Sequence, residues 1–162
     1  MPDVDPSQFR QLLGRYATGV AVVTANAPEG TPAGMTANSL TSVSLTPPLI
    51  SICVDQSTDM HRVLLQTQQF VLNLLATDQE MISRRFAGQH ENRFEGIGYH
   101  LNHQGLVVLD GIIGHIECER YDAHDAGDHT IFIARVTGGA TGGGAGRPLL
   151  YYRGGYTQLS DP

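Results

Sequence analysis

Short apolar runs, separated by turn-forming residues, recur along the chain and predict a protein built mainly of β-strands. Each run has the length and the Val, Ile and Leu content of a buried strand. The runs are 20–25 (VAVVTA), 49–54 (LISICV), 70–75 (FVLNLL), 112–118 (IIGHIEC), 130–136 (TIFIARV) and 148–154 (PLLYYRG). Two segments between the last three runs, 121–128 (YDAHDAGD) and the glycine-rich 138–146 (GGATGGGAG), predict the loops of antiparallel hairpins. This pattern favours a β-barrel with helical decoration.

Helical signals are confined to three short stretches. Ser7 can cap a first helix, in which apolar residues recur at helical spacing as far as a break near residues 18–19. These apolar residues are Phe9, Leu12, Leu13 and Tyr16. One of the residues 57–59 (STD) can cap a second helix, and 77–80 (TDQE) has the capping-box spacing, which predicts a third helix over about residues 78–86.

Composition and charge fit one globular domain over residues 1–162. Hydrophobic residues make up 41% of the chain and charged residues 16%. Ten basic against sixteen acidic residues give a formal charge of −6, which repels nucleic acid. The start MPDVDPSQF lacks the apolar core of a signal sequence, and no apolar run reaches the ~20 residues needed to cross a bilayer. A cytoplasmic protein without nucleic-acid or membrane partners is therefore expected.

Several motifs that could carry chemistry are incomplete. The glycine-rich 138–146 leads into a strand and lacks the Gly-Lys-Ser/Thr of a phosphate loop. His100 and His103 form a close pair, but no HExxH motif or cysteine pair accompanies them, so no metal site is predicted. No Gly-x-Ser-x-Gly motif supports a hydrolase. Cys53 and Cys118 lie in apolar runs, so we expect small buried side chains rather than a disulfide or a nucleophile.

A cluster of hydroxyl side chains between residues 36 and 58 has two interpretations. Its members are Thr36, Ser39, Thr41, Ser42, Ser44, Ser51, Ser57 and Thr58. Ser and Thr cap helices, fill turns and fit strands, so the cluster can be purely structural. Together with backbone N–H groups, the same hydroxyls can also line a site for a planar ligand that carries a phosphate. The residue pattern alone leaves both interpretations open.

Five segments together form the most specific pattern of the chain. They are 34–54 (GMTANSLTSVSLTPPLISICV), 70–75 (FVLNLL), 84–88 (RRFAG), 126–136 (AGDHTIFIARV) and 148–156 (PLLYYRGGY). In this order they resemble the flavin reductase-like family, and the resemblance covers a core of about residues 9–159. It implies an FMN-binding split β-barrel, a Greek-key-like antiparallel barrel that is mostly β with a few short helices.

The resemblance also implies flavin-binding residues in the hydroxyl-rich region. The flavin ring and ribityl chain would be held by Thr36, Ala37, Asn38 and Ser39. The isoalloxazine ring would be flanked by Ser51, Cys53 and Val54, and the phosphate would face Ser57 and Thr58. Some relatives carry a lysine here, whereas this chain has DQSTD at residues 55–59, so neutral donors and a helix N-terminus must do more of the anion binding.

Three later motifs complete the implied site. In RRFAG, the cofactor would meet Arg85, Phe86 and Ala87; Arg84 and Arg85 are the nearest cations, and solvated charges at a helix C-terminus are the alternative. In the second motif, Gly127 leaves room, Asp128 can orient the ring of His129, and His129 would contact the nicotinamide as the catalytic residue. A hairpin histidine with a structural role is the alternative. Tyr152 and Arg153 would contact flavin or nicotinamide nucleotide.

By this resemblance, the chain is expected to be an NAD(P)H-dependent flavin reductase. It would transfer a hydride from NADH or NADPH to FMN or FAD and supply reduced flavin to a separate flavin-dependent monooxygenase. A homodimer with flavin near the subunit interface is expected. Two alternatives remain, a flavin- or haem-binding split-barrel protein without reductase turnover and a non-enzymatic β-barrel interaction module. The choices between FMN and FAD, and between NADH and NADPH, stay open.

Overall fold

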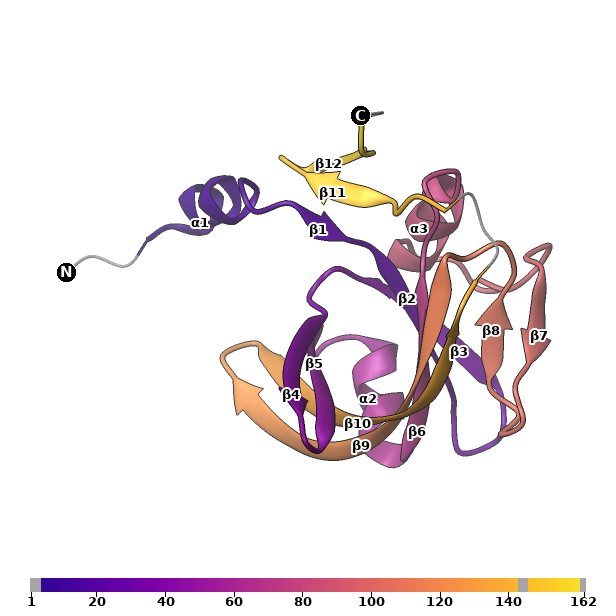
Figure 1. Ribbon diagram of the computed structural model, residues 1–162. Coiled ribbons are helices and arrows are strands. Elements are labelled where there is room, and N and C mark those ends of the chain that lie inside the picture. The colour runs from indigo at the N-terminus through magenta and orange to yellow at the C-terminus, as the bar shows by residue number, and fades with distance from the viewer. Residues whose placement is uncertain (1–3, 143–145, 161–162) are drawn as a thin grey trace.

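A seven-stranded antiparallel sheet forms the body of the protein (Figure 1). The computed structural model describes residues 4–142 and 146–160. The strands of this sheet lie in the order β3-β2-β6-β9-β10-β5-β4. Their bounds are β2 Ala21–Asn26, β3 Pro32–Ala37, β4 Thr41–Leu45, β5 Pro48–Asp55, β6 Gln69–Leu74, β9 Gly114–Ala126 and β10 His129–Thr141. The prediction of a mostly β protein is confirmed.

Within residues 4–142 and 146–160, two small sheets and three short helices surround the main sheet. One small sheet has the order β1-β11-β12, and the other pairs β7 with β8. The strands are β1 Thr18–Gly19, β7 Tyr99–Leu101, β8 Val107–Leu109, β11 Leu150–Tyr152 and β12 Gly155–Thr157. The helices are α1 Pro6–Leu13, α2 Asp59–Gln66 and α3 Glu80–Ala87. Figure 1 shows α1 extending away from the curled sheet, next to the strands of the first small sheet.

The strand alternation divides the apolar residues between two cores. The core enclosed by the curled sheet contains Ile52, Phe70 and Phe132, and α2 adds Met60 and Leu64 to it. The second core lies on the outer face of β2 and β6, under α3 and the β7–β8 hairpin. Its members include Val22, Val71, Phe86 and Leu109. Because each fully buried Phe or Leu side chain contributes about 1.5–3 kcal/mol, these two cores supply much of the stabilisation of the fold.

Helix α1 begins at Pro6, two residues earlier than a Ser7 cap would place it, and buries none of its side chains. The Asp5 carboxylate caps it, accepting hydrogen bonds from the backbone N–H groups of Ser7 (2.8 Å) and Gln8 (3.0 Å). The prediction of Ser7 as the cap was therefore wrong, because Pro6 suits the first helical position and moves the cap upstream. The apolar residues at helical spacing are Phe9, Leu12, Leu13 and Tyr16, and all four are more than half exposed.

Of the caps predicted for the other two helices, the α2 cap forms and the α3 capping box does not. Thr58 caps α2, and its hydroxyl accepts a hydrogen bond from the His61 N–H. At α3 the capping box does not form, because the Thr77 hydroxyl donates instead to Gln158 Oε1 (2.9 Å). The side chain of Gln79 accepts from the Ala76 N–H at this end. A tertiary partner thus overrides the local capping pattern.

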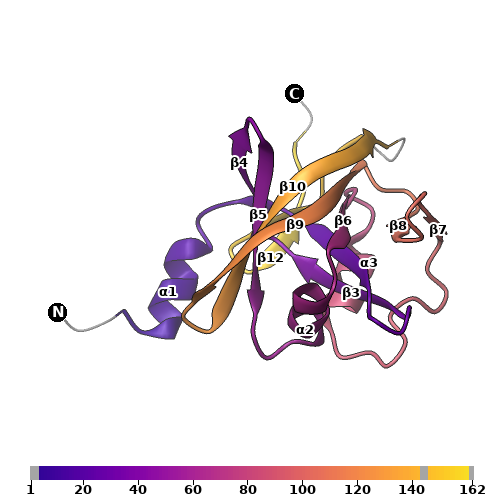
Figure 2. The ribbon, with the colours of Figure 1, turned by 90° about the horizontal axis from the view of Figure 1, so that it is seen from below.

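The hairpin of β9 and β10 is longer than the sequence predicts. Residues 121–126 were expected to form a loop, but they continue β9, and only Gly127 and Asp128 turn the chain (Figure 2). Gly127 has a φ of +66°, the conformation that tight hairpin turns require at this position. Residues 138–141 of the glycine-rich segment belong to β10, and 143–145 lie outside the described residues. Continuous backbone pairing outweighs the polar, loop-like composition here.

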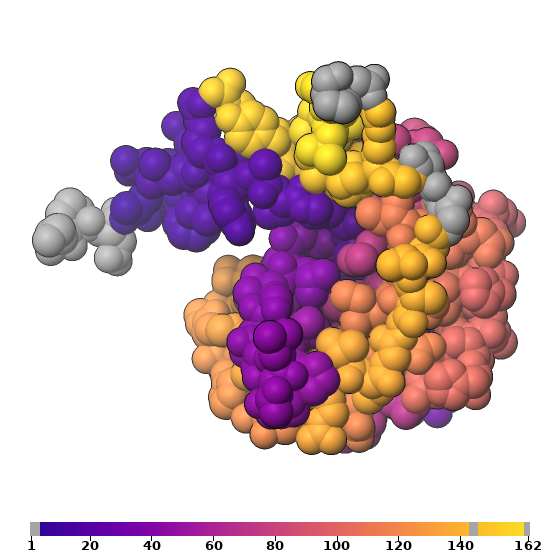
Figure 3. All heavy atoms as spheres, viewed as in Figure 1, coloured from indigo at the N-terminus to yellow at the C-terminus, as the bar shows by residue number. Residues whose placement is uncertain are grey.

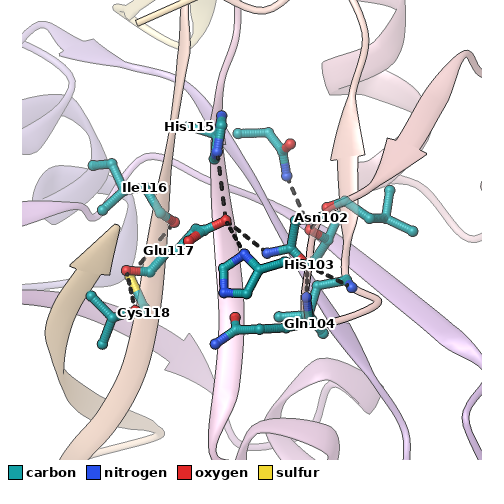
Figure 4. Close-up of polar contacts among 12 residues, drawn as sticks. Asn102, His103, Gln104, His115, Ile116, Glu117 and Cys118 are labelled. Atoms are coloured by element: carbon teal, nitrogen blue, oxygen red, sulfur yellow. Dashed lines mark hydrogen bonds and ion pairs between the residues drawn. The ribbon is translucent and has the colours of Figure 1, made fainter. Parts of the chain in front are cut away.

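A buried carboxylate attaches the β7–β8 hairpin to the main sheet (Figure 4). Glu117 of β9 is 8% exposed, and its Oε1 accepts a hydrogen bond from Asn102 Nδ2 (2.8 Å) in the turn between β7 and β8. His103 Nδ1 and His115 Nε2 each lie 3.8 Å from the same oxygen. As expected, the side chains of His100 and His103 are largely exposed. His103 and His115 thus flank the Glu117 carboxylate, whereas His100 Nδ1 lies 3.3 Å from Asp110 Oδ1.

The open side of the sheet is held by hydroxyl groups. The edge strands β3 and β4 do not pair with each other. Between them, Ser39 Oγ accepts a hydrogen bond from the Cys53 N–H (2.9 Å) and donates to the Cys53 carbonyl (3.1 Å). On β3, Thr36 Oγ1 donates to the Ser83 carbonyl of α3 (2.6 Å). Both ends of the β3–β4 connection are thereby fixed to neighbouring elements.

Gly34→Ala should destabilise the protein by about 1–3 kcal/mol, the usual cost of overpacking. A Cβ at Gly34 would lie 2.5 Å from Cε1 of Phe86 and 3.1 Å from Cζ of Phe94, so β3 would be pushed away from α3. Gly19→Ala is the matched control, because a Cβ there meets no atom within 4 Å. Urea denaturation measures both. Equal midpoints for the two variants would contradict the tight packing of β3 on α3.

Ser39→Ala should also lower stability, by about 1–3 kcal/mol, because it leaves the Cys53 N–H without its partner. Ser42→Ala, at an exposed position on the adjacent β4, serves as the control and should change stability little. Thermal unfolding followed by circular dichroism gives the comparison. A Ser39 variant as stable as the Ser42 variant would show that the sheet closes without this hydroxyl.

Candidate functional site

A cavity of about 920 Å³ lies between the N-terminal segment, the first small sheet and the end of β3. Figure 3 shows the hollow between the indigo N-terminal segment and the purple strands. Five of the predicted site residues line this cavity together, namely Ala37, Asn38, Ser39, Cys53 and Tyr152. The small side chains at its floor let a flat ligand approach the backbone closely, and the volume lies within the usual range for small-molecule sites.

The alternation of β5 decides which of its residues can face this cavity. Ser51 and Cys53 are partly exposed on the outer face, whereas Val54 is fully buried in the enclosed core. The backbone of Val54, and not its side chain, is thus the part that can meet a ligand. Cys53 and Cys118 are both free, and burial raises the pKa of the Cys118 thiol to about 12. Cys118 is thus the small buried side chain that the sequence predicts.

The predicted phosphate residues surround Asp55 at the end of β5. The Asp55 carboxylate accepts hydrogen bonds from the Ser57 N–H and from Ser57 Oγ, both at 2.7 Å. The Thr58 hydroxyl donates to the Asp55 carbonyl (2.8 Å). Both hydroxyl protons are therefore used within this corner. An anion bound here would have to rely on backbone N–H groups at the start of α2.

These bonds also set the ionisation of Asp55. The hydrogen bonds from Ser57, with smaller effects of the nearby His129 and His61, lower the pKa of the Asp55 carboxyl below its ordinary value of 3.8. Because the folded-state pKa is lowered, this carboxylate stabilises the fold above pH 3.8. The contribution is lost as the pH falls through the lowered pKa. Asp55 is therefore anionic at neutral pH, beside the predicted phosphate site.

His129 stands at the tip of the β9–β10 hairpin, next to this corner. Its Nδ1 lies 2.7 Å from Asp128 Oδ1, so the neighbouring carboxylate orients the ring, and the side chain is 41% exposed. The pairing of β10 with β5 places His129 opposite Asp55, and the cavity-lining Cys53 is two residues further along β5. Two residues of a strand span ~7 Å. The imidazole thus lies near the cavity but does not line it.

The remaining predicted residues lie on α3 and near the C-terminus. Arg84 forms an ion pair with Glu80, whereas Arg85 donates to the Asn92 carbonyl (3.2 Å). Phe86 is buried in the second core, so it acts as packing for β3. Ala87 ends the helix and is exposed.

Near the C-terminus, Tyr152 lines the cavity, and the guanidinium of Arg153 lies 5.3 Å from the centre of its ring. Arg153 has a φ of +53°, which is unusual for a residue with a side chain. Its N–H donates to the Gly14 carbonyl (2.8 Å), so the C-terminal strands fix the segment that follows α1. The implied site residues thus form three groups, at the cavity, at the Asp55 corner and on α3.

Sequence patterns did not identify the opposite wall of the cavity. It is formed by α1 and the residues after it, including Phe9, Leu13, Tyr16 and Thr18. The Thr18 hydroxyl is buried there with no hydrogen-bond partner among the described residues. The apolar face of α1 was visible in the sequence, but its spacing is equally typical of a helix packed in a core.

The described residues provide neither a metal-binding cluster nor a membrane-spanning helix. Within residues 4–142 and 146–160, no group of three or more His, Cys, Asp or Glu side chains is placed to hold a metal ion. None of the helices in this part of the chain is long and apolar enough to span a membrane.

Comparisons with known sequences and solved structures identify the same protein family. Residues 13–160 match the family described as flavin reductase like domain. An FMN reductase (NADH) of Agrobacterium fabrum is 40% identical over 152 residues, which are 94% of this chain and 85% of that protein.

Solved structures agree with this match. Nitrilotriacetate monooxygenase component B from Mycobacterium thermoresistibile superposes with a TM-score of 0.91 at 34% identity, covering 95% of this chain and 86% of that one. The NADH:FAD oxidoreductase of Streptomyces globisporus, solved in complex with NAD and FAD fragments, gives a TM-score of 0.90 at 35% identity, covering 99% and 98%. The chain therefore belongs to the flavin reductase-like family.

Proposed function

We propose that this protein is an NAD(P)H-dependent flavin reductase that supplies reduced FMN or FAD to a separate flavin-dependent monooxygenase. The observation that carries the proposal is the cavity floored by Ala37, Asn38 and Ser39 in a member of this family. Relatives support both halves of it, since one is an FMN reductase (NADH) and another a monooxygenase component. The two free cysteines fit a reducing, cytoplasmic compartment.

The residues present fit a flavin. The cavity is large and mostly lined by apolar side chains, and the exposed Asn38 amide offers both donors and an acceptor to a polar ring edge. A bound flavin would accept the hydride from the nicotinamide at its own ring. The task of the chain is to position the two rings and to keep water out, and no nucleophile is required.

Each group of residues has a distinct part in this proposal. Ala37, Asn38 and Ser39 support the flavin ring, with Cys53 beside it. The start of α2 and Arg85 attract the phosphate. His129, held by Asp128, contacts the nicotinamide at the rim, and Tyr152 closes the cavity from the C-terminal side.

The test is a steady-state assay that crosses NADH and NADPH with FMN, FAD and riboflavin. Loss of nicotinamide absorbance that depends on added flavin is expected for at least one combination. Flavin binding without turnover would favour a flavin-binding protein that is not a reductase. No quenching of flavin fluorescence at all would favour an interaction module.

His129→Ala should reduce kcat/KM for the nicotinamide by about 1–2 kcal/mol, the size of one uncharged hydrogen bond or stacking contact. Flavin affinity should stay the same, because His129 is not among the residues that line the cavity. His124→Ala, on the same hairpin, is the control. A wild-type rate for the His129 variant at every nicotinamide concentration would show that His129 has only a structural role in the hairpin.

We also propose that two copies associate through α1. Phe9, Leu12 and Leu13 of this helix are exposed, as is Tyr16 just after it, and a helix of eight residues needs such a face covered to be stable. Phe9, Leu13 and Tyr16 also line the cavity, so a second copy packed on α1 would complete the site. An interface of more than ~1,500 Å² is expected.

Leu12→Asp should convert the dimer to monomers in sedimentation experiments at micromolar concentration and weaken flavin binding. Burying an unpaired carboxylate at an apolar interface is strongly unfavourable. Gln11→Asp adds the same charge on the opposite face of α1 and should leave the dimer intact. A wild-type protein that is monomeric and fully active would refute the association.

A further inference from the structure

A hydrogen-bond network ties the tip of the β9–β10 hairpin to α2. From it we infer that His61 is a positioning residue that acts through Thr130 to hold His129 in place for the nicotinamide. The inference rests on the proposed function, because it assigns a support to the residue that contacts the nicotinamide there. His61 lies in the first turn of α2, and neither His61 nor Thr130 lines the large cavity.

The Thr130 hydroxyl is the centre of the network. Thr130 is 1% exposed, and its Oγ1 donates a hydrogen bond to Asp125 Oδ1 (2.9 Å). His61 Nε2 lies 2.8 Å from the same Oγ1, and Gln56 Nε2 donates to it over 3.4 Å. A hydroxyl has one proton and the Asp125 carboxylate can only accept, so this proton is used on Asp125. His61 therefore donates to Thr130 from Nε2.

The His61 ring is itself held by two neighbours. The backbone N–H of His61 donates to the Oγ1 of Thr58, the residue that caps α2 (3.2 Å). The ring packs edge to face against the fully buried Phe132 of β10, with centroids 5.8 Å apart and an interplanar angle of 66°. Because the cap and the buried ring fix the imidazole, its bond to Thr130 holds the start of β10 against α2.

Strand alternation places this network directly behind His129. Thr130 pairs with the fully buried Val54 of β5, so its side chain faces the enclosed core. His129 and Ile131 point to the opposite face, and Ile131 pairs there with the cavity-lining Cys53. A displacement of Thr130 would therefore move His129 on the face that the cavity shares.

Gln56 holds the same tip from the end of β5. Its backbone N–H donates to the Asp128 carbonyl (3.0 Å), and its side-chain Nε2 donates to the His129 carbonyl (3.3 Å). Together with the bond from His61 to Thr130, three successive residues of the hairpin are fixed by the corner between β5 and α2. A ring that must meet the nicotinamide in one orientation requires such a preorganised support.

His61→Phe tests the inference, because it keeps a ring against Phe132 and removes the donor to Thr130. The kcat/KM for the nicotinamide should fall about five-fold, the loss of one uncharged hydrogen bond, while flavin affinity in a fluorescence titration stays the same. Thr130→Val should show the same loss. His61→Gln should restore most of kcat/KM, since an amide also offers an N–H donor. Thr137→Val removes a hydroxyl further along β10 and is the control.

The double variant His61→Phe/His129→Ala separates positioning from a general structural effect. It should be no slower than His129→Ala alone, because a residue that acts through His129 then has nothing left to position. Hydrogen exchange in the protein without ligands gives a readout that does not depend on activity. The Gln56 N–H, which is bonded to the hairpin, should exchange faster in His61→Phe and at the wild-type rate in Thr137→Val.

The inference is overturned if the losses of the two single variants add in the double variant. It is also overturned if His61→Phe keeps both the wild-type kcat/KM and the wild-type exchange of the Gln56 N–H. A wild-type protein that oxidises neither NADH nor NADPH with any flavin would instead overturn the proposed function. The exchange rates would then still decide whether His61 holds the hairpin.

Discussion

The hydrogen bonds between Ser39 and the backbone of Cys53 are the contact on which the site depends. Both edges of the main sheet meet here without pairing. β4 pairs with β5 up to Thr41, which lies opposite Ser51. Two residues further along β5, the Ser39 hydroxyl replaces a strand partner by binding the backbone of Cys53. The chain can therefore leave β3 while the backbone N–H and carbonyl of Cys53 keep a hydrogen-bond partner. Leaving these groups unpaired would destabilise the fold. Asn38 is thereby held at the cavity.

This use of hydroxyl groups changes what the fold offers to a ligand. A hydroxyl has one proton to donate. Thr36 gives its proton to Ser83, and Ser57 and Thr58 give theirs to Asp55. The structural and the ligand-binding interpretations of the hydroxyl-rich segment are therefore both partly right. Its hydroxyls hold the backbone in place, and this backbone forms the wall of the cavity. An uncharged ring is better served by such a fixed, small-residue surface than by side chains that must reorient.

The sequence predicted those features that depend on neighbouring residues. Buried strands follow from apolar runs, and the α2 cap follows from Thr58, whose partner is three residues away. The predictions that failed did so because of contacts with residues far away in the sequence. Thr77 binds Gln158 instead of its own helix, and residues 121–126 become strand because β10 pairs with them. The cavity joins α1 to β11, and no local pattern specifies contacts over that separation. Family resemblance supplied the site residues that periodicity could not.

β3 has to be rigid if its end supports a ligand in the cavity, although it has a strand partner on one side only. Helix α3 supplies the missing constraint. Alternate residues of β3 face it, so that Gly34 packs against Phe86 and accepts a hydrogen bond from Arg93, while Thr36 is tied to Ser83. An edge strand held only by its ladder would be free to bend and fray. Fixed at two points on its outer face, β3 holds Ala37, its last residue, in place at the floor of the cavity.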